Sequence, residues 1–225
     1  MKNILIIEFL GAPGTGKTTL STELIKSLKE KNEQIYSRED IYSWYHGLSF
    51  GGKFFLFLSH FKTIFWTFFN VLLILMGRNQ KKHIRKRFLW ILTFPTMLKK
   101  FSRENKGIIV LDEGLLNWVS GLSTDFNRSV NANLICGILK KQNIKMVVYI
   151  DRNISNSFEV NANQKSESSN LKNYQYCYDE YKKLHKNIGE VFEKVKSCQI
   201  CFCAIDNESV KKGVARIRNI IHQIK

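Results

Sequence analysis

The sequence predicts an α/β fold, in which a parallel five-stranded sheet carries helices on both faces. Short, mainly apolar runs alternate with longer segments of helical periodicity, which is the pattern of strands joined by crossover helices. Most of these runs are apolar at successive residues, as expected for parallel strands that are buried on both faces. The predicted strands are residues 4–9, 34–37, 107–111, 144–150 and 199–205.

Helices are predicted between these strands and after the last one. Residues 18–31 place Leu20, Leu24 and Leu28 at helical spacing directly after the first strand. Further helices are predicted at residues 130–141, 171–196 and 208–224. By contrast, residues 153–173 are rich in Asn, Ser and Gln, and we expect a mobile loop or lid there.

Length and charge limit the classes of function. The 225 residues suit one domain, with a helical insertion at about 44–101 and a lid-like segment at about 152–172. Lys and Arg number 35 against 19 Asp and Glu, so the formal net charge is +16. This excess favours nucleotides, nucleic acid or an anionic membrane as partners, without choosing among them.

The cysteines and the N-terminus predict a compartment. No signal peptide is expected, because the N-terminal strand contains Glu8 and is not followed by a small-residue cleavage site. We therefore expect a cytoplasmic protein with reduced thiols. Cys198, Cys201 and Cys203 are interpreted as buried residues of the last strand, because no second pair of ligands for zinc is evident.

A glycine-rich segment after the first strand matches the phosphate-loop pattern G-x-x-x-x-G-K-[ST]. Between a strand and a helix, such a loop aims successive N–H groups and the helix dipole at an anion. We expect Lys17 to contact the β- and γ-phosphates of a nucleotide and Thr18 to ligate Mg²⁺. The candidate nucleotide-binding residues are Gly11, Ala12, Pro13, Gly14, Thr15, Gly16, Lys17, Thr18 and Thr19. The predicted sheet is therefore of the P-loop NTPase type.

Two acids follow the third predicted strand directly. Asp112 and Glu113 come after Leu111, at the edge of the sheet to which the phosphate loop also belongs. In phosphate-loop proteins an acid at this place holds Mg²⁺ or activates the acceptor. Asp112 is the candidate Mg²⁺ residue together with Thr18, and both acids are candidates for catalysis. The sequence leaves open which of them is the base.

Several short segments carry a family resemblance. They are Ile7–Gly11 running into Gly16–Leu20, then Ser37–Asp40, Asp112–Gly114 and Ala204–Asn207. Together they resemble the thymidylate-kinase-like branch of the nucleoside and nucleotide kinases. The resemblance covers both ends of the chain and its middle strands. It implies ATP and Mg²⁺ as cofactors and phosphoryl transfer to a small acceptor.

The resemblance also carries over individual residues and marks departures. Arg38 lies where the family contacts the acceptor, and Arg152 is a candidate for the lid arginine that clamps the transferred phosphoryl group. Glu113 stands where the family has an arginine, and no proline follows Glu39. These departures make thymidylate a doubtful acceptor.

The insertion at residues 44–101 is aromatic and basic and has three interpretations. A membrane-spanning helix needs ~20 apolar residues, whereas the uncharged run from Thr63 to Gly77 has fifteen. A single crossing would also separate the phosphate loop from Asp112. The second interpretation is a set of helices that pack over the acceptor site. The third is an interfacial helix with a cationic flank on an anionic membrane.

The leading hypothesis is an ATP-dependent small-molecule kinase that transfers the γ-phosphoryl group of ATP to a small acceptor. The acceptor is nucleotide-like or another small molecule, and membrane-associated acceptors are included. The alternative is a regulatory P-loop ATPase or ATP-binding protein that acts at a membrane surface. Nucleic acid is the less favoured partner of the basic cluster, because that cluster adjoins bulky apolar residues. A homodimer and peripheral attachment to the inner face of the membrane stay open.

Overall fold

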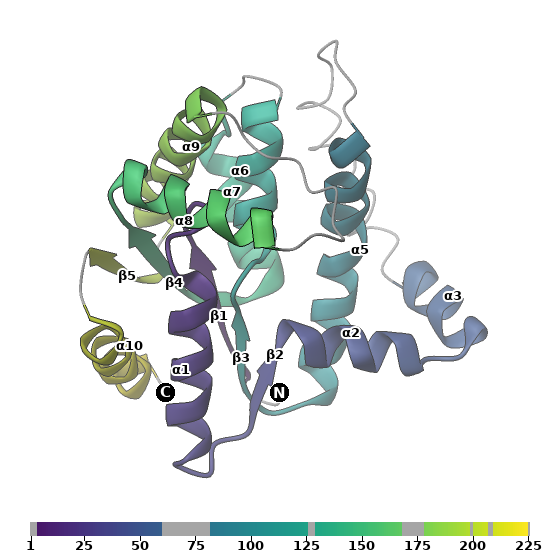
Figure 1. Cartoon of the computed structure of the whole chain (residues 1–225). Coiled ribbons are helices and arrows are strands. Elements are labelled where there is room, and N and C mark those ends of the chain that lie inside the picture. Colours follow the sequence, from purple (N-terminus) through teal and green to yellow (C-terminus); the bar gives the residue numbers. More distant parts are fainter. Residues whose placement is uncertain are drawn as a thin grey trace.

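The computed structural model describes residues 4–59, 82–125, 129–167, 178–198, 200–206 and 209–224. Its core is one parallel sheet with the strand order β2-β3-β1-β4-β5 (Figure 1). The strands are β1 (Ile4–Leu10), β2 (Ile35–Ser37), β3 (Gly107–Leu111), β4 (Ile144–Asp151) and β5 (Cys201–Asp206). The predicted five-stranded parallel sheet is confirmed, and the strand that leads into the glycine-rich loop lies at its centre.

The helices connect the strands and form the insertion. Their bounds are α1 (Lys17–Lys29), α2 (Arg38–Gly47), α3 (Phe50–Ser59), α5 (Lys82–Glu104), α6 (Leu115–Asp125), α7 (Ala132–Gln142), α8 (Ile154–Glu167), α9 (Tyr178–Lys196) and α10 (Val210–Ile224). Of the insertion, residues 60–81 lie outside the described residues. No helix in the described parts of the chain is both long and apolar enough to cross a membrane.

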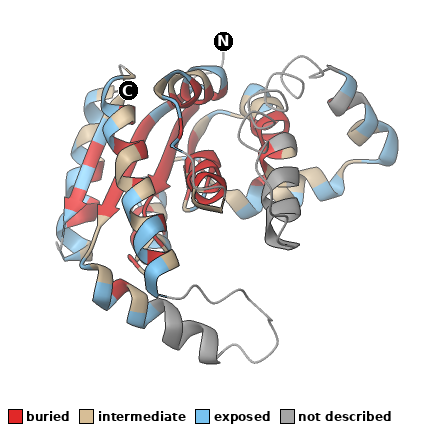
Figure 2. Ribbon diagram, turned by 90° about the horizontal axis from the view of Figure 1, so that it is seen from above, coloured by how far each residue is buried: buried red, intermediate tan, exposed pale blue. Residues whose placement is uncertain are grey.

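Two apolar clusters cover the two faces of the sheet. On one face, α1 and α10 contribute Leu24 and Ile217, which pack with Ile7 of β1. On the other face, α5, α6, α7 and α9 pack against the sheet, with Phe94 and Leu116 among their fully buried residues. Figure 2 shows the buried residues concentrated on the strands and on the helix faces turned toward them. Helices on both faces are therefore confirmed.

The segment at residues 153–173 corrects the sequence prediction, because residues 154–167 form helix α8 instead of a loop. The Asn153 side chain accepts a hydrogen bond from the Ser155 N–H at 2.9 Å, which starts the helix. Phe158 packs edge-on against Tyr178 and Tyr181 of α9. Tertiary packing thus overrides a local composition that favours loops. Residues 168–177, the rest of the expected lid, lie outside the described residues.

The expectation of reduced thiols is also corrected. A disulfide joins Cys136 of α7 to Cys198, which lies after α9 and before β5. The two residues are 62 positions apart in the chain, so only the packing of α7 against α9 brings them together. Strand β5 begins at Cys201, two residues later than predicted. Helix α6, which directly follows the Asp112–Gly114 segment, was not among the predicted elements.

Candidate active site

The glycine-rich loop leaves the central strand and enters α1 within six residues. Gly14 and Gly16 have positive φ angles of 82° and 90°, which residues with a side chain rarely adopt. The Thr15 hydroxyl donates to the Ala12 carbonyl at 2.8 Å and closes the turn. Gly16 is the N-cap of α1 and has no side chain to bond the first amides of the helix. These amides can therefore bind an anion.

Lys17 lies across the loop. Its Nζ donates to the carbonyls of Gly11 at 2.7 Å and Ala12 at 2.8 Å. Burial lowers the pKa of Lys17 to about 8, although the negative charges of Glu113 and Asp112 oppose the shift. Phosphate oxygens at this position would offer the ammonium group stronger, charged partners than two carbonyls do.

Two side chains from other elements hold the loop in place. Asn117 of α6 accepts from the Gly11 N–H at 3.3 Å and donates to the Phe9 carbonyl at 2.6 Å, so it fixes the exit from β1. Tyr181 of α9 donates its hydroxyl to the Pro13 carbonyl at 2.6 Å. The loop is thus positioned by helices that follow it by about a hundred residues or more, and its sequence alone gave no sign of them.

The two predicted metal residues meet at the carboxyl edge of the sheet. The Thr18 hydroxyl donates to Asp112 Oδ2 at 3.4 Å. A hydroxyl and a carboxylate beside a phosphate site are the protein oxygens that Mg²⁺ uses when substrate phosphates and water supply its other ligands. The residues present therefore fit a magnesium ion. No group of three or more His, Cys, Asp or Glu that could hold a metal occurs in the described residues.

Arg38, the first residue of α2, is surrounded by acids. It donates to Glu113 Oε2 at 3.0 Å and to Glu39 Oε1 at 3.3 Å, and its Nε lies 3.6 Å from Asp112 Oδ1. Burial disfavours the charged guanidinium, but Asp112 and Glu113 raise the pKa of Arg38 above its ordinary value. Arg38 therefore brings a guanidinium to Glu113, the position where the resembling family has an arginine.

An aromatic cluster adjoins Arg38. Tyr42, one helical turn further along α2, lies against Trp90 at 4.8 Å between ring centroids and against Phe94 at 5.8 Å. Trp118 of α6 stacks on Trp90 at 6.2 Å. Burial raises the pKa of Tyr42 to about 12, although the charge of Arg38 opposes the shift. Aromatic rings from α2, α5 and α6 thus gather beside the cationic group.

Glu8 contacts the start of α6, just after the strand-end acids in the chain. It is fully buried in β1, and its Oε1 accepts from the Leu116 N–H at 2.6 Å. Gly114 lies directly against it, since a Cβ at that position would be 2.5 Å from Glu8 Cδ. Burial raises the pKa of Glu8 to about 8, although amides at the start of α6 oppose the shift. An ionisable residue inside an apolar strand was the signal that could have marked this position.

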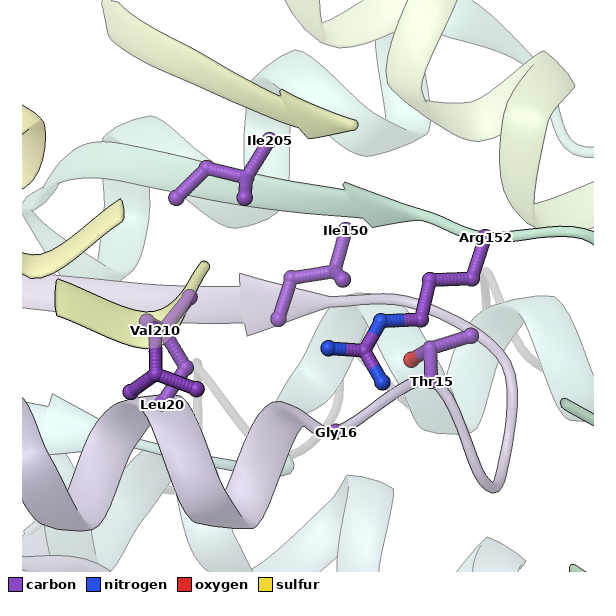
Figure 3. A pocket seen from close by; sticks show the side chains of 7 residues that line it. All are labelled: Thr15, Gly16, Leu20, Ile150, Arg152, Ile205 and Val210. Atoms are coloured by element: carbon purple, nitrogen blue, oxygen red, sulfur yellow. The ribbon is translucent and has the colours of Figure 1, made fainter. Parts of the chain in front are cut away.

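Arg152 lies on the other side of the loop. Its guanidinium approaches Gly16, where a Cβ would be 3.4 Å from Cζ. Figure 3 shows its side chain beside Thr15 and Gly16 at one end of a small pocket. The pocket is lined by Thr15, Gly16, Leu20, Ile150, Arg152, Ile205 and Val210. It is therefore cationic near the loop and apolar toward β5 and α10.

His185 of α9 contacts the backbone just after the end of β4, where Arg152 lies. His185 Nε2 lies 3.3 Å from the Arg152 carbonyl oxygen and 3.3 Å from Asp151 Oδ1. The structure thus brings Asp112, at the end of β3, next to Thr18 at the start of α1, and Arg38 and Glu113 lie beside Asp112. Arg152 is at the opposite side of Gly16, and Thr19 is exposed on the first turn of α1.

No family model and no curated protein sequence matches this chain. Among solved structures, it matches the deoxyadenosine kinase of M. mycoides with the products dCMP and a flexible dCDP bound. The identity is 18%, the match covers 98% of this chain and 100% of the kinase, and the TM-score is 0.55. The same kinase with bound dATP matches at 18% identity over 97% and 99% of the two chains, with a TM-score of 0.54.

The chain has a nucleotide-kinase fold. The predicted resemblance is thereby confirmed at the level of the fold. A thymidylate kinase from Ehrlichia chaffeensis matches at 13% identity over 97% of this chain and 99% of its own, with a TM-score of 0.48. In this kinase fold, the glycine-rich loop, Asp112 and Arg38 occupy the carboxyl edge of the sheet.

Proposed function

We propose that the chain is an ATP-dependent small-molecule kinase that transfers the γ-phosphoryl group of ATP to a small acceptor. The observation that carries this proposal is the contact between Thr18 and Asp112. It joins a complete phosphate loop to a strand-end acid in a nucleotide-kinase fold. Catalysis would consist mainly of positioning and of charge stabilisation by groups that are already in place.

The donor nucleotide would occupy the loop and the pocket beside it. The first amides of α1 would bind phosphate oxygens, and Lys17 would exchange the carbonyls of Gly11 and Ala12 for the β- and γ-phosphates. Arg152 would add a positive charge on the far side of Gly16. Ile205 and Val210, at the apolar end of the pocket, would offer side chains against which a nucleobase could pack.

Thr18 and Asp112 are the residues that would hold Mg²⁺. When bound, the ion would neutralise charge on the transferred phosphoryl group. With Asp112 assigned to the metal, Glu113 is the remaining acid of the pair. Its side chain is 50% exposed, so it can reach an acceptor hydroxyl from the solvent side. Glu113 is thus our proposed base, and Arg38 holds it in place at 3.0 Å.

The acceptor would lie beside Arg38 and the aromatic cluster of Tyr42, Trp90, Phe94 and Trp118. A guanidinium beside aromatic rings suits an acceptor with both a polar group and a planar or apolar part. A nucleoside or nucleotide has both features. Deoxynucleosides are the first acceptors to test, because the structurally similar kinase of M. mycoides is named for one.

The test is transfer of radiolabelled γ-phosphate from ATP to a panel of deoxynucleosides, ribonucleosides and their monophosphates. We expect a labelled ester with at least one acceptor, and Lys17→Ala should reduce its formation by about a thousandfold or more. Lys26→Ala is the matched control, because Lys26 is an exposed lysine on the same helix. Transfer that survives Lys17→Ala would refute the assigned site.

A regulatory ATPase is the second candidate, and one observation favours it. Arg38 forms ion pairs with three carboxylates, which leaves less positive charge to stabilise a phosphoryl group during its transfer. The same assay separates the two functions. An ATPase would release the label as inorganic phosphate with every acceptor, whereas a kinase would divert it to one of them.

A further inference from the structure

Helix α3 carries an apolar stripe on its outer side. The side chains of Phe50, Phe54 and Leu58 follow one another at intervals of four residues and are 87%, 60% and 57% exposed. This spacing places them along one face of the helix. Leu56, which points to the other side, is only 3% exposed. The helix therefore has a buried face and a second, apolar face that the rest of the described structure leaves open.

The position of α3 makes this face accessible. Figure 1 shows α3 at the periphery of the molecule, beyond α2 and away from the sheet. It packs against α5, and Lys53 of α3 also contacts α2 by donating to the His46 carbonyl at 3.4 Å. Large exposed apolar residues on a helix that projects from a domain are typical of a binding surface for an apolar partner.

The surrounding sequence indicates which partner. From Ile41 to Arg103 the chain contains no Asp and no Glu. The same segment contains the cations Lys53, Lys62, Arg78, Lys81, Lys82, Arg85, Lys86, Arg87, Lys99, Lys100 and Arg103. An apolar helix face within a purely cationic segment has the chemistry that binds an anionic lipid surface.

We propose that α3 lies on an anionic lipid bilayer, with Phe50, Phe54 and Leu58 inserted at the boundary between headgroups and acyl chains. The positive charge of the segment would then attract the anionic headgroups. A second copy of this chain fits less well, because the contact would bring two cationic segments together. Nucleic acid fits less well also, since a stripe of two phenylalanines and a leucine offers it no hydrogen bonds.

The test is co-sedimentation of the full chain with phosphatidylcholine vesicles, prepared with and without phosphatidylglycerol. We expect binding only to the anionic vesicles, and weaker binding at high salt. The triple variant Phe50→Ser, Phe54→Ser, Leu58→Ser should bind at least about tenfold more weakly. Phe202→Ser is the matched control, because Phe202 is 44% exposed on β5, the edge strand opposite β2.

Thermal melting of each variant checks the fold, because the three side chains make up an exposed face and their loss should not lower the melting temperature. The proposal is overturned if the wild-type chain does not bind anionic vesicles or if the triple variant binds them as strongly as Phe202→Ser does. It is also overturned if the triple variant abolishes a self-association seen by sedimentation, or an RNA complex seen by gel shift, while vesicle binding is unchanged. None of these outcomes depends on kinase activity.

Discussion

The donor half and the acceptor half of the proposed site are built in different ways. The donor half, Gly11 to Thr18 with Asp112, consists mostly of backbone groups and of hydrogen bonds of 2.7 to 3.4 Å at the ends of β1 and β3 and the start of α1. The acceptor half, Arg38 and Glu113 with the aromatic cluster, consists of side chains from α2, α5 and α6 that meet through ion pairs and ring contacts.

The donor half is constrained by the chemistry of phosphate binding, whereas the residues of the acceptor half can vary. A phosphate group demands converging amides and a cation, and few sequences provide them. An acceptor pocket only needs side chains of suitable shape and charge, which can come from many positions. The donor half therefore follows a common pattern, whereas the acceptor half has Glu113 in place of an arginine.

Substitution of Arg38 should distinguish the two halves most clearly, because it should affect the acceptor and not ATP. Arg38→Ala should raise the KM for the acceptor or lower kcat by about 10- to 100-fold, because a charged hydrogen bond contributes about 1.5–3 kcal/mol. The KM for ATP should stay unchanged. Steady-state kinetics with each substrate varied in turn gives both values.

Glu113→Ala and the double variant complete a cycle with Arg38→Ala. If the two residues act as one unit, the double variant should be no worse than the poorer single variant. An increase in the KM for ATP with no change for the acceptor would instead place Arg38 in the donor half.

The pKa of Lys17 gives the next largest effect, within the donor half. Because burial lowers this pKa to about 8, a large part of Lys17 is neutral in the empty loop above that pH. Binding of a triphosphate restores the charged form, so it takes up a proton. Titration of Lys17 should leave the affinity for ATP unchanged below pH 8 and lower it by up to about tenfold per pH unit above pH 8.

Calorimetry in buffers of different ionisation enthalpy measures this proton uptake directly. The number of protons that Lys17 takes up per ATP bound should approach one near pH 9 and zero near pH 7. Equal proton uptake at pH 7 and pH 9 would contradict the assignment of Lys17 to the phosphates.

Glu8 is expected to affect stability, through its contact with the start of α6. Its pKa is raised to about 8 from an ordinary 4.5, so the folded state binds a proton that the unfolded state has lost. The free energy of unfolding should therefore decrease from about pH 4.5 to pH 8, by up to about 1.4 kcal/mol per pH unit, and then level off.

Glu8→Gln should remove this decrease, because the amide keeps an oxygen for the Leu116 N–H and does not titrate. Urea unfolding at several pH values compares the variant with the wild type. Glu23→Gln, an exposed glutamate of α1, is the control that should keep the wild-type profile. Parallel profiles for wild type and Glu8→Gln would show that Glu8 is not the group responsible.

The sequence predicted the parts that are local in the chain. The sheet, α1 and the loop follow from short apolar runs and from eight consecutive residues. The approach of Asp112 to Thr18 was also predicted, because parallel strands place their carboxyl ends on one edge. These features need no knowledge of how distant side chains pack.

The remaining parts depend on distant contacts. Asn117 and Tyr181 bond loop residues that are 106 and 168 positions away. The disulfide between Cys136 and Cys198 depends on the packing of α7 and α9. Residues 154–167 are helical because Phe158 has partners on α9. Arg152 was predicted to clamp the phosphoryl group, but its exact place beside Gly16 depends on the turn held by His185.

Binding of ATP to the wild-type chain and to Lys17→Ala is the most direct test of the central claim, that Gly11 to Thr18 is the donor site. Titration calorimetry should show Mg²⁺-dependent binding of one ATP to the wild type and to Lys26→Ala. Lys17→Ala should bind ATP much more weakly or not at all. Failure of the wild-type chain to bind ATP, or equal binding by Lys17→Ala, would contradict this account.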